Sequence, residues 1–305
     1  MKAGLATRLG PLLLPNPVLC ASGTFGYGEE MAPYLDVSRL GGIVCKTVTR
    51  APRDGNAPPR TCETAAGMLN AIGLQNVGLE GFIAGKLPFL RSCGAPVIVN
   101  IAGETVEDFA FLCRALSEQS GIAAIELNIS CPNVAHGLDF ATDPFLTEDV
   151  VSHARRATDL PLLAKLSPNV SDISVIARAA QNGGADALSV ANTFVGLAID
   201  IRTRRPRLSN ITGGLSGPAI KPLALRAVWR CAGAVEIPII GIGGIASARD
   251  ALEFLIAGAS AVQVGTATFA QPGATLEVLE GIQAYLDENG FDDVAQIVGS
   301  LDTGR

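Results

Sequence analysis

Eight short apolar segments recur along the chain, and they limit its fold more than any other feature of the sequence. Each is rich in β-branched residues and apolar on both faces, which is typical of parallel strands covered by helices. They span 17–22, 42–49, 96–102, 123–130, 161–167, 187–192, 237–245 and 261–266. Stretches with helical periodicity lie between most of them, at 106–117, 147–158, 172–181, 218–231 and 248–256. We therefore predict an α/β fold, a closed (β/α)8 TIM barrel, with a doubly wound open sheet as the alternative.

Two long segments interrupt this alternation. Residues 50–81 are rich in Pro, Arg and Asn, and residues 192–217 contain an arginine run and a glycine-rich stretch. Long ordered loops inside a compact domain are usually lids or binding loops, so we expect both to be inserted over the C-terminal face of the barrel. The run from Arg202 to Arg207 contains Pro206 and predicts a solvated loop. No linker, repeat or low-complexity tract divides the chain, so we predict one domain over residues 1–305.

Composition excludes several classes of protein. Hydrophobic residues make up 48% of the chain and charged residues 17%, which argues against disorder. The net charge is −6 and no basic stripe is present, so nucleic acid is not an expected partner. No apolar stretch reaches the roughly 20 residues of a membrane span, and the N-terminus lacks a signal-peptide pattern. We expect a soluble cytoplasmic protein that does not enter a membrane.

The seven cysteines are widely spaced, and none forms the C-x-x-C spacing of a zinc, iron–sulfur or redox site. We therefore predict no metal in this chain and interpret six cysteines as small buried hydrophobes. Cys131 differs because it leaves a predicted strand into a Pro- and Gly-containing loop, where a thiol can ionise. The only histidines are His136, which either tunes this loop or has no chemical role, and His153, which we place on a helix surface. Such scarcity argues against Ser–His or metal–His catalysis.

Polar side chains end the predicted strands, where the active sites of barrels form. The last two strands end in glycine-rich turns, Gly241-Ile-Gly-Gly-Ile245 and Val264-Gly-Thr-Ala267, which allow backbone amides to approach a phosphate. The pattern Gly241-x-Gly243-x-x-Ala246 also matches a dinucleotide fingerprint, but no acidic residue follows about 20 positions later. A phosphorylated cofactor such as FMN agrees better with the sequence. The polar residues at the strand ends are Ser22, Lys46, Thr47, Asn100, Asn128, Lys165, Asn192 and Thr193.

From Leu9 to Ala267 the chain resembles the class 1 dihydroorotate dehydrogenases. The most specific motifs are Cys45-Lys-Thr, Asn70-Ala-Ile-Gly-Leu-Gln-Asn76, Glu126-Leu-Asn-Ile-Ser-Cys-Pro-Asn-Val134 and Gly241-Ile-Gly-Gly-Ile245. The resemblance implies one FMN per subunit, bound by Ser22, Lys46, Thr47, Asn100, Asn128, Lys165, Ala191, Gly217, Gly243, Gly244, Gly265 and Thr266. It implies that dihydroorotate is held by Lys46, Asn70, Ala71, Ile72, Gly73, Leu74, Asn128, Asn192 and Thr193. Ala191 stands where the family often has a larger aliphatic residue, and we expect little consequence because only its backbone would be used.

The same resemblance implies the chemistry. The enzyme would oxidise (S)-dihydroorotate to orotate in pyrimidine (UMP) biosynthesis, with Cys131 taking the C5 proton and the flavin taking the C6 hydride. Lys165 would offset negative charge on the reduced flavin. Only a few per cent of an unperturbed thiol is ionised at pH 7, so activity should rise towards alkaline pH.

The electron acceptor divides this class. Asn70–Asn76 and Ile129-Ser-Cys-Pro-Asn-Val-Ala-His-Gly137 are similar to the NAD-linked catalytic subunit, class 1B (EC 1.3.1.14). This subunit would act as a homodimer within a heterotetramer, with FAD and a [2Fe–2S] cluster in the electron-transfer partner. A self-sufficient fumarate-reducing homodimer, class 1A, is the alternative. Another FMN barrel, such as a tRNA dihydrouridine synthase, and a flavin- or phosphate-binding module without turnover also stay open.

Overall fold

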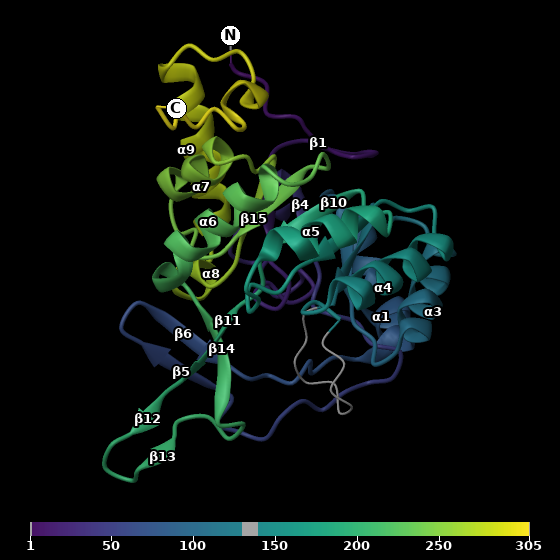
Figure 1. The fold of residues 1–305 in the computed structure, drawn as a ribbon. Coiled ribbons are helices and arrows are strands. Elements are labelled where there is room, and N and C mark those ends of the chain that lie inside the picture. Colours follow the sequence, from purple (N-terminus) through teal and green to yellow (C-terminus); the bar gives the residue numbers. More distant parts are fainter. Residues whose placement is uncertain (1, 130–139, 305) are drawn as a thin grey trace.

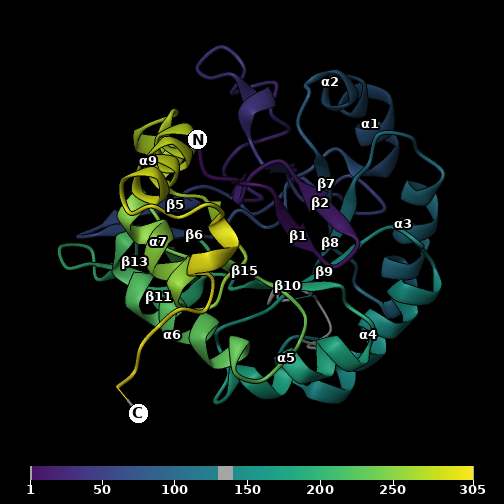
Figure 2. The same cartoon turned by 90° about the horizontal axis from the view of Figure 1, so that it is seen from above.

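The computed structural model describes residues 2–129 and 140–304, and its centre is a closed barrel of eight parallel strands (Figures 1 and 2). Each strand lies within one predicted segment. Because β16 pairs with β3, the sheet closes on itself; the (β/α)8 prediction is confirmed and the open-sheet alternative is wrong. In barrel order the strands are β3 (Val18–Cys20), β4 (Gly42–Val44), β7 (Val97–Ile101), β8 (Ala124–Asn128), β9 (Leu162–Lys165), β10 (Ala187–Val190), β15 (Ile239–Ile242) and β16 (Ala261–Val264).

Helices surround the barrel (Figure 2), and several of them begin at a side-chain cap. Thr105 and Asp108 form a capping box at the start of α3, and Asp143 accepts hydrogen bonds from two amides at the start of α4. The Asp143 cap and Pro144 start α4 three residues before the predicted helix. The helices are α1 (Gly78–Gly85), α2 (Leu87–Ser92), α3 (Val106–Ser117), α4 (Pro144–Arg156), α5 (Ile173–Asn182), α6 (Lys221–Ala232), α7 (Ala248–Ile256), α8 (Ala267–Ala270) and α9 (Ala274–Glu288), with 3-10 turns at Val37–Arg39, Pro218–Ile220 and Val294–Ile297. No helix in the described ranges is long and apolar enough to cross a membrane.

The barrel interior is layered. An apolar plug fills its amino-terminal end, where the hairpin of β1 (Thr7–Leu9) and β2 (Leu12–Leu14) lies across the barrel (Figure 2). Because side chains alternate along a strand, residues two positions beyond the plug face the interior again, nearer to the carboxyl ends. The plug contains Leu9, Leu12, Leu14, Leu19, Val44, Ile98, Ala124, Leu163, Ala187, Ile240 and Ala261. The layer above it contains the buried polar residues Asn100, Glu126, Ser189 and Gln263.

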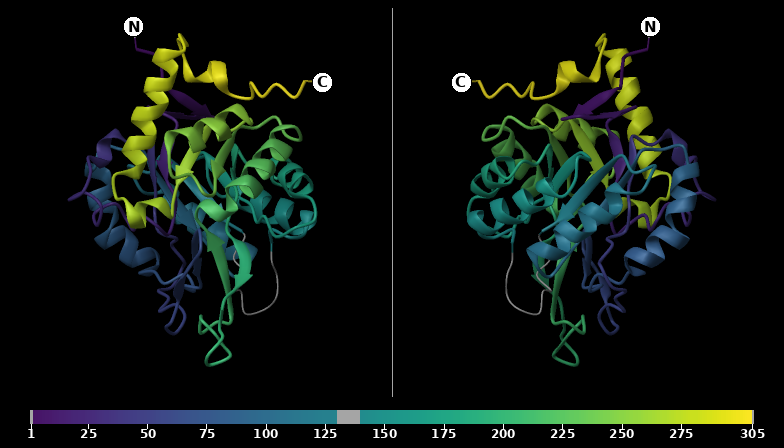
Figure 3. Two further views of the ribbon diagram at one scale, coloured as in Figure 1. Left: turned by 90° about the vertical axis from the view of Figure 1, so that its left-hand side faces the viewer. Right: turned by 90° about the vertical axis from the view of Figure 1, so that its right-hand side faces the viewer.

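The two inserted segments join in one antiparallel sheet, which we call the insertion sheet. Its order is β11 (Phe194–Leu197), β14 (Thr212–Ser216), β6 (Gly67–Asn70) and β5 (Thr61–Thr64). We predicted loops here, and this is corrected: the strands are short and only partly buried, so they lack the long buried segments of the barrel strands. The sheet lies beyond the barrel, at the opposite end from the chain termini (Figures 1 and 3).

The arginine run lies at the tip of this insertion. Residues 201–207 are all exposed, as predicted for a solvated segment, and Arg205–Pro206 forms β13, which pairs with β12 (Ile199–Asp200). The run is therefore part of a short hairpin and not only a loop.

The cysteines divide into two groups in the described residues. Cys20, Cys45, Cys113 and Cys231 are buried, as predicted, whereas Cys62 and Cys93 are half-buried. The prediction of six buried cysteines is corrected for these two, because Cys62 lies on strand β5 of the insertion sheet and Cys93 follows the short helix α2.

Candidate functional site

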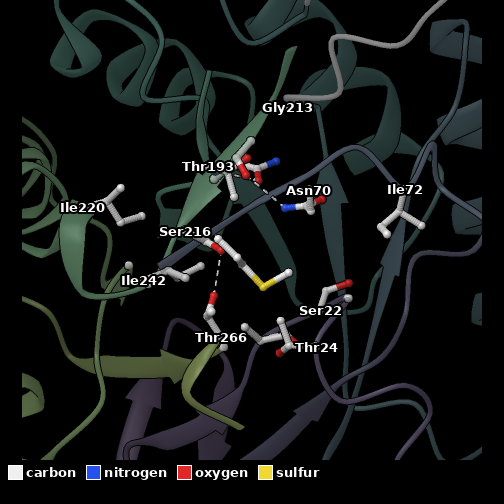
Figure 4. A pocket seen from close by; sticks show the side chains of 18 of the residues that line it. Ser22, Thr24, Asn70, Ile72, Thr193, Gly213, Ser216, Ile220, Ile242 and Thr266 are labelled. Atoms are coloured by element: carbon white, nitrogen blue, oxygen red, sulfur yellow. Dashed lines mark hydrogen bonds between the residues drawn. The ribbon is translucent and has the colours of Figure 1, made fainter. Parts of the chain in front are cut away.

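A cavity of about 470 Å³ lies between the carboxyl end of the barrel and the insertion sheet (Figure 4). This volume is within the range of small-molecule sites, roughly 300–1,000 Å³. Its lining combines residues at the ends of the barrel strands with residues of β6, β11 and β14. The insertion therefore forms one wall of the site, as expected for segments placed over the C-terminal face.

The cavity brings together almost all the site residues predicted from the sequence. Every predicted substrate-binding residue lines it, from Lys46 to Thr193. The predicted cofactor residues that line it are Ser22, Lys46, Thr47, Asn128, Lys165, Ala191, Gly217, Gly243, Gly244, Gly265 and Thr266. Asn100 is the one exception: it is fully buried in the layer below and is not part of the lining. Cys131 and His136 lie outside the described residues, and His153 lies on α4 with 41% of its side chain exposed.

One end of the cavity is a cradle of backbone. Gly217, Gly243 and Gly244 have positive φ angles of 95°, 132° and 74°. A Cβ at Gly244 would lie 2.8 Å from the backbone N of Lys221 and 2.9 Å from the carbonyl O of Gly217, so only glycine is accommodated there. The amides of Gly243, Gly244, Gly265 and Thr266 donate no hydrogen bond within the described residues. Free backbone amides that line one end of a cavity are suited to a phosphate group.

Lys165 introduces a buried positive charge. It ends strand β9, is only 7% exposed and lines the cavity, yet it has no hydrogen-bond or ion-pair partner in the described part of the chain. The residue is almost enclosed, so the cavity is the place from which its ammonium group can gain a partner. The arrangement therefore favours an electron-rich or anionic ligand beside Lys165.

The opposite end of the cavity offers amides and hydroxyls. Asn70 Nδ2 donates to the carbonyl of Gly214 on β14 at 3.3 Å (Figure 4). Nearer to the cradle, Thr266 Oγ1 donates to Ser216 Oγ at 2.8 Å. The turn that follows Asn70 has positive φ at Gly73 and Leu74, and it brings residues 70–74 to the cavity. These groups can form hydrogen bonds with a small polar ring.

Asn169 was not predicted as a site residue. It lines the cavity, donates from Nδ2 to the carbonyl of Thr193 at 3.0 Å and accepts from the amide of Val195 at 2.9 Å. It therefore holds the start of β11 against the barrel. No motif marked it, because it lies in a loop after β9. Met68, Val195 and Phe269 also line the cavity and were missed, since they lie outside the barrel-strand pattern.

Glu126 was noted only as part of a motif, but it organises the layer beneath the cavity. Its fully buried carboxylate accepts hydrogen bonds from Asn100 Nδ2 at 2.7 Å, Ser189 Oγ at 2.6 Å and Gln263 Nε2 at 2.8 Å. The four residues come from β7, β8, β10 and β16. A glutamate inside the apolar segment 123–130 was the available signal, because a buried charge requires partners.

The buried cysteines are unsuited to act as bases. Burial raises the pKa of the Cys113 and Cys231 thiols to about 12, and it raises the pKa of Cys20 and Cys45 well above the ordinary value. These thiols stay protonated at neutral pH. A thiolate base in this chain would have to be another cysteine.

Comparison with known proteins gives one consistent result. The profile of a family described as Dihydroorotate dehydrogenase matches residues 4–286. Three relatives carry the name Dihydroorotate dehydrogenase B (NAD(+)), catalytic subunit. The protein from Pelobacter propionicus is 55% identical, with 99% of this chain and 100% of the relative covered. Those from Trichlorobacter lovleyi (54% identical; 99% and 100% covered) and Desulforudis audaxviator (55% identical; 98% and 98% covered) are similar to the same extent.

Proposed function

Because the chain belongs to the dihydroorotate dehydrogenase family, we propose that it is the catalytic subunit of an NAD-linked dihydroorotate dehydrogenase that oxidises (S)-dihydroorotate to orotate in pyrimidine biosynthesis. One observation carries the proposal: a single cavity joins a cradle of free backbone amides to the buried, unpartnered Lys165. The relatives have the same name over nearly their whole length.

The cofactor we assign is FMN, with its phosphate on Gly217, Gly243, Gly244, Gly265 and Thr266. When bound, FMN would supply the hydride acceptor for the oxidation. Lys165 would stabilise the negative charge that reduction places on the flavin ring, because a fixed cation in a site shielded from water interacts strongly with such charge. Ser22, Thr47, Asn128 and the backbone of Ala191 complete the assigned contacts, and Asn100 would support them from the layer below.

The substrate is assigned to the end of the cavity that carries amides. Lys46 lines the cavity and is the cation that we assign to the carboxylate of dihydroorotate. We assign the ring of the substrate to residues 70–74 with Asn128, Asn192 and Thr193. Asn169 holds Thr193 in place because it donates to the Thr193 carbonyl and accepts from the amide of Val195. Cys131 remains the proposed base for the C5 proton on the evidence of its motif in the sequence.

We further propose that electrons reach NAD⁺ through an electron-transfer subunit that carries FAD and a [2Fe–2S] cluster. The word "subunit" in the names of the relatives supports such a partner. The chain would act as one cytoplasmic domain, as a homodimer within a heterotetramer. A fumarate-reducing homodimer is the outcome that would replace this part of the proposal.

The test uses the purified chain loaded with FMN under anaerobic conditions. Dihydroorotate should bleach the flavin, and neither NAD⁺ nor fumarate should reoxidise it until the partner subunit is added with NAD⁺. Cys131→Ala should retain yellow FMN and lose nearly all bleaching. Rapid reoxidation by fumarate would assign the chain to class 1A, and a wild-type flavin that dihydroorotate does not bleach would refute the proposed substrate.

A further inference from the structure

A chain of ion pairs outside the cavity links the two glycine loops of the cradle. Lys221 is the first residue of α6 and directly follows the loop that begins at Gly217. Its Nζ lies 2.7 Å from Asp250 Oδ1 and 2.9 Å from Glu253 Oε2, both on α7. The other oxygen of Asp250 accepts hydrogen bonds from the Ala246 amide at 3.0 Å and from Ser247 Oγ at 2.8 Å. The cation therefore connects the loop before α6 to the loop before α7.

The backbones of the two loops are also in direct contact. The space at the α-carbon of Gly244 is closed by the N and Cβ of Lys221 and by the carbonyl of Gly217. A displacement of Lys221 would therefore move the surface against which Gly244 packs. Lys221 and Asp250 are mostly buried, with side-chain exposures of 26% and 16%, so their attraction is less screened than that of a surface pair.

None of the three charged side chains reaches the cavity. Lys221, Asp250 and Glu253 are absent from its lining, where the cations are Lys46 and Lys165. Lys221 therefore acts through the position of the loops and not by touching a ligand. The hydrogen bonds from its ammonium group to Asp250 and Glu253 raise its pKa, so it stays charged at neutral pH.

We propose that Lys221 is a positioning residue for the phosphate group of FMN, because its ion pairs hold the loop of Gly243 and Gly244, whose amides are free, against the loop that begins at Gly217. This inference rests on the proposed function. A phosphate carries close to two negative charges and needs several donors at once, so it is more sensitive to loop separation than the neutral part of the cofactor. Removal of the ammonium group would also leave the Asp250 carboxylate without its ion-pair partner.

Riboflavin provides the discriminating ligand because it has the same ring and ribityl chain but no phosphate. Apo-protein is titrated with FMN and with riboflavin, and the quenching of flavin fluorescence gives each dissociation constant. Lys221→Met should weaken FMN binding about tenfold, the equivalent of one lost charge-assisted hydrogen bond, and change riboflavin binding less than about twofold. Arg249→Met is the matched control: it also removes a cation next to Glu253, at 3.7 Å, but its side chain is 90% exposed.

Three outcomes would overturn the inference. If the Lys221→Met variant binds FMN as tightly as the Arg249→Met variant does, the ion pairs do not position the phosphate. Equal losses for FMN and riboflavin would show a general loosening of the fold. If Lys221→Met does not fold, Glu253→Gln keeps the Asp250 pair and should give a smaller loss, about two- to threefold, confined to FMN; wild-type affinity for both ligands would then refute the inference. A wild-type protein that does not bind FMN would refute the proposed function as well.

Discussion

Replacement of Glu126 tests whether the layer beneath the cavity depends on hydrogen bonds or on charge. Glu126→Ala would remove the acceptor of Asn100 and Ser189, whereas Gln263 Nε2 would keep a contact with Ser189 Oγ at 3.4 Å. Each buried polar group left without a partner costs about 1–3 kcal/mol. For two such groups we expect the free energy of unfolding to fall by about 4 kcal/mol, which lowers Tm by about 6 °C in a chain of this size.

Glu126→Gln should lower the free energy of unfolding far less than Glu126→Ala. A glutamine can accept from Ser189 and Gln263 through its oxygen and donate to Asn100 through its nitrogen, provided that the Asn100 amide rotates. Asn100 can rotate without losing a bond, because its Oδ1 has no hydrogen-bond partner in the structure. All three contacts then survive as neutral hydrogen bonds, and the lost charge assistance is partly offset by the lower cost of burying a neutral group. We therefore expect Glu126→Gln to lower the free energy of unfolding by less than about 2 kcal/mol.

Equilibrium unfolding in urea, followed by circular dichroism, measures both variants. Ser189→Ala is the control that removes one donor and should cost about 1 kcal/mol. If Glu126→Gln were as destabilising as Glu126→Ala, the negative charge itself would be required and the hydrogen-bond reasoning would be refuted.

Three further predictions concern the thiols, the buried cation and the packing of the barrel. Iodoacetamide at pH 7–9 should not label Cys113 or Cys231 in the folded protein, since a pKa of about 12 keeps both thiols protonated over this range; mass spectrometry should show labelling only after unfolding. Lys165→Met should retain bound FMN but slow anaerobic bleaching by dihydroorotate about 10²-fold or more, measured by stopped flow. Gly241→Ala would place a Cβ 2.5 Å from the ring of Phe254, and a thermal melt should show a destabilisation of about 1–3 kcal/mol.

The barrel was predictable because its strands are buried on both faces. Every barrel strand lies within a mostly apolar segment that is buried on both faces, so composition marks it. The insertion sheet was not predictable in this way. Its strands contain Thr61, Glu63 and Gly213 and are mostly half-buried or exposed. The pairing of β14 with β6 joins two segments that lie more than a hundred residues apart in the sequence. Contacts between segments so distant in the sequence leave no local pattern.

Which residues line the cavity was largely predictable from the sequence. How deep each residue lies in the barrel was less predictable. Residues directly after barrel strands lie at the cavity because the carboxyl ends of parallel strands meet at one face. Asn100 lies within strand β7 and not beyond it, so it is one layer too deep to line the cavity. Asn169 belongs to a loop whose course follows from its contacts with Thr193 and Val195, which only the folded chain creates.

The alternation of side chains along each strand connects the plug, the buried polar layer and the cavity. Along β8 the inward residues are Ala124, Glu126 and Asn128, and along β16 and its end they are Ala261, Gln263 and Gly265. The hydrogen bond from Gln263 to Glu126 joins two strands on opposite sides of the barrel. Asn128 lies two residues after Glu126, and Gly265 lies two residues after Gln263. The hydrogen bond beneath them therefore fixes the positions of Asn128 and Gly265 relative to one another. The polar layer thus sets the distance between the cavity wall assigned to substrate and the glycine turn assigned to phosphate, which is a reason to retain a buried carboxylate that an apolar barrel interior does not otherwise need.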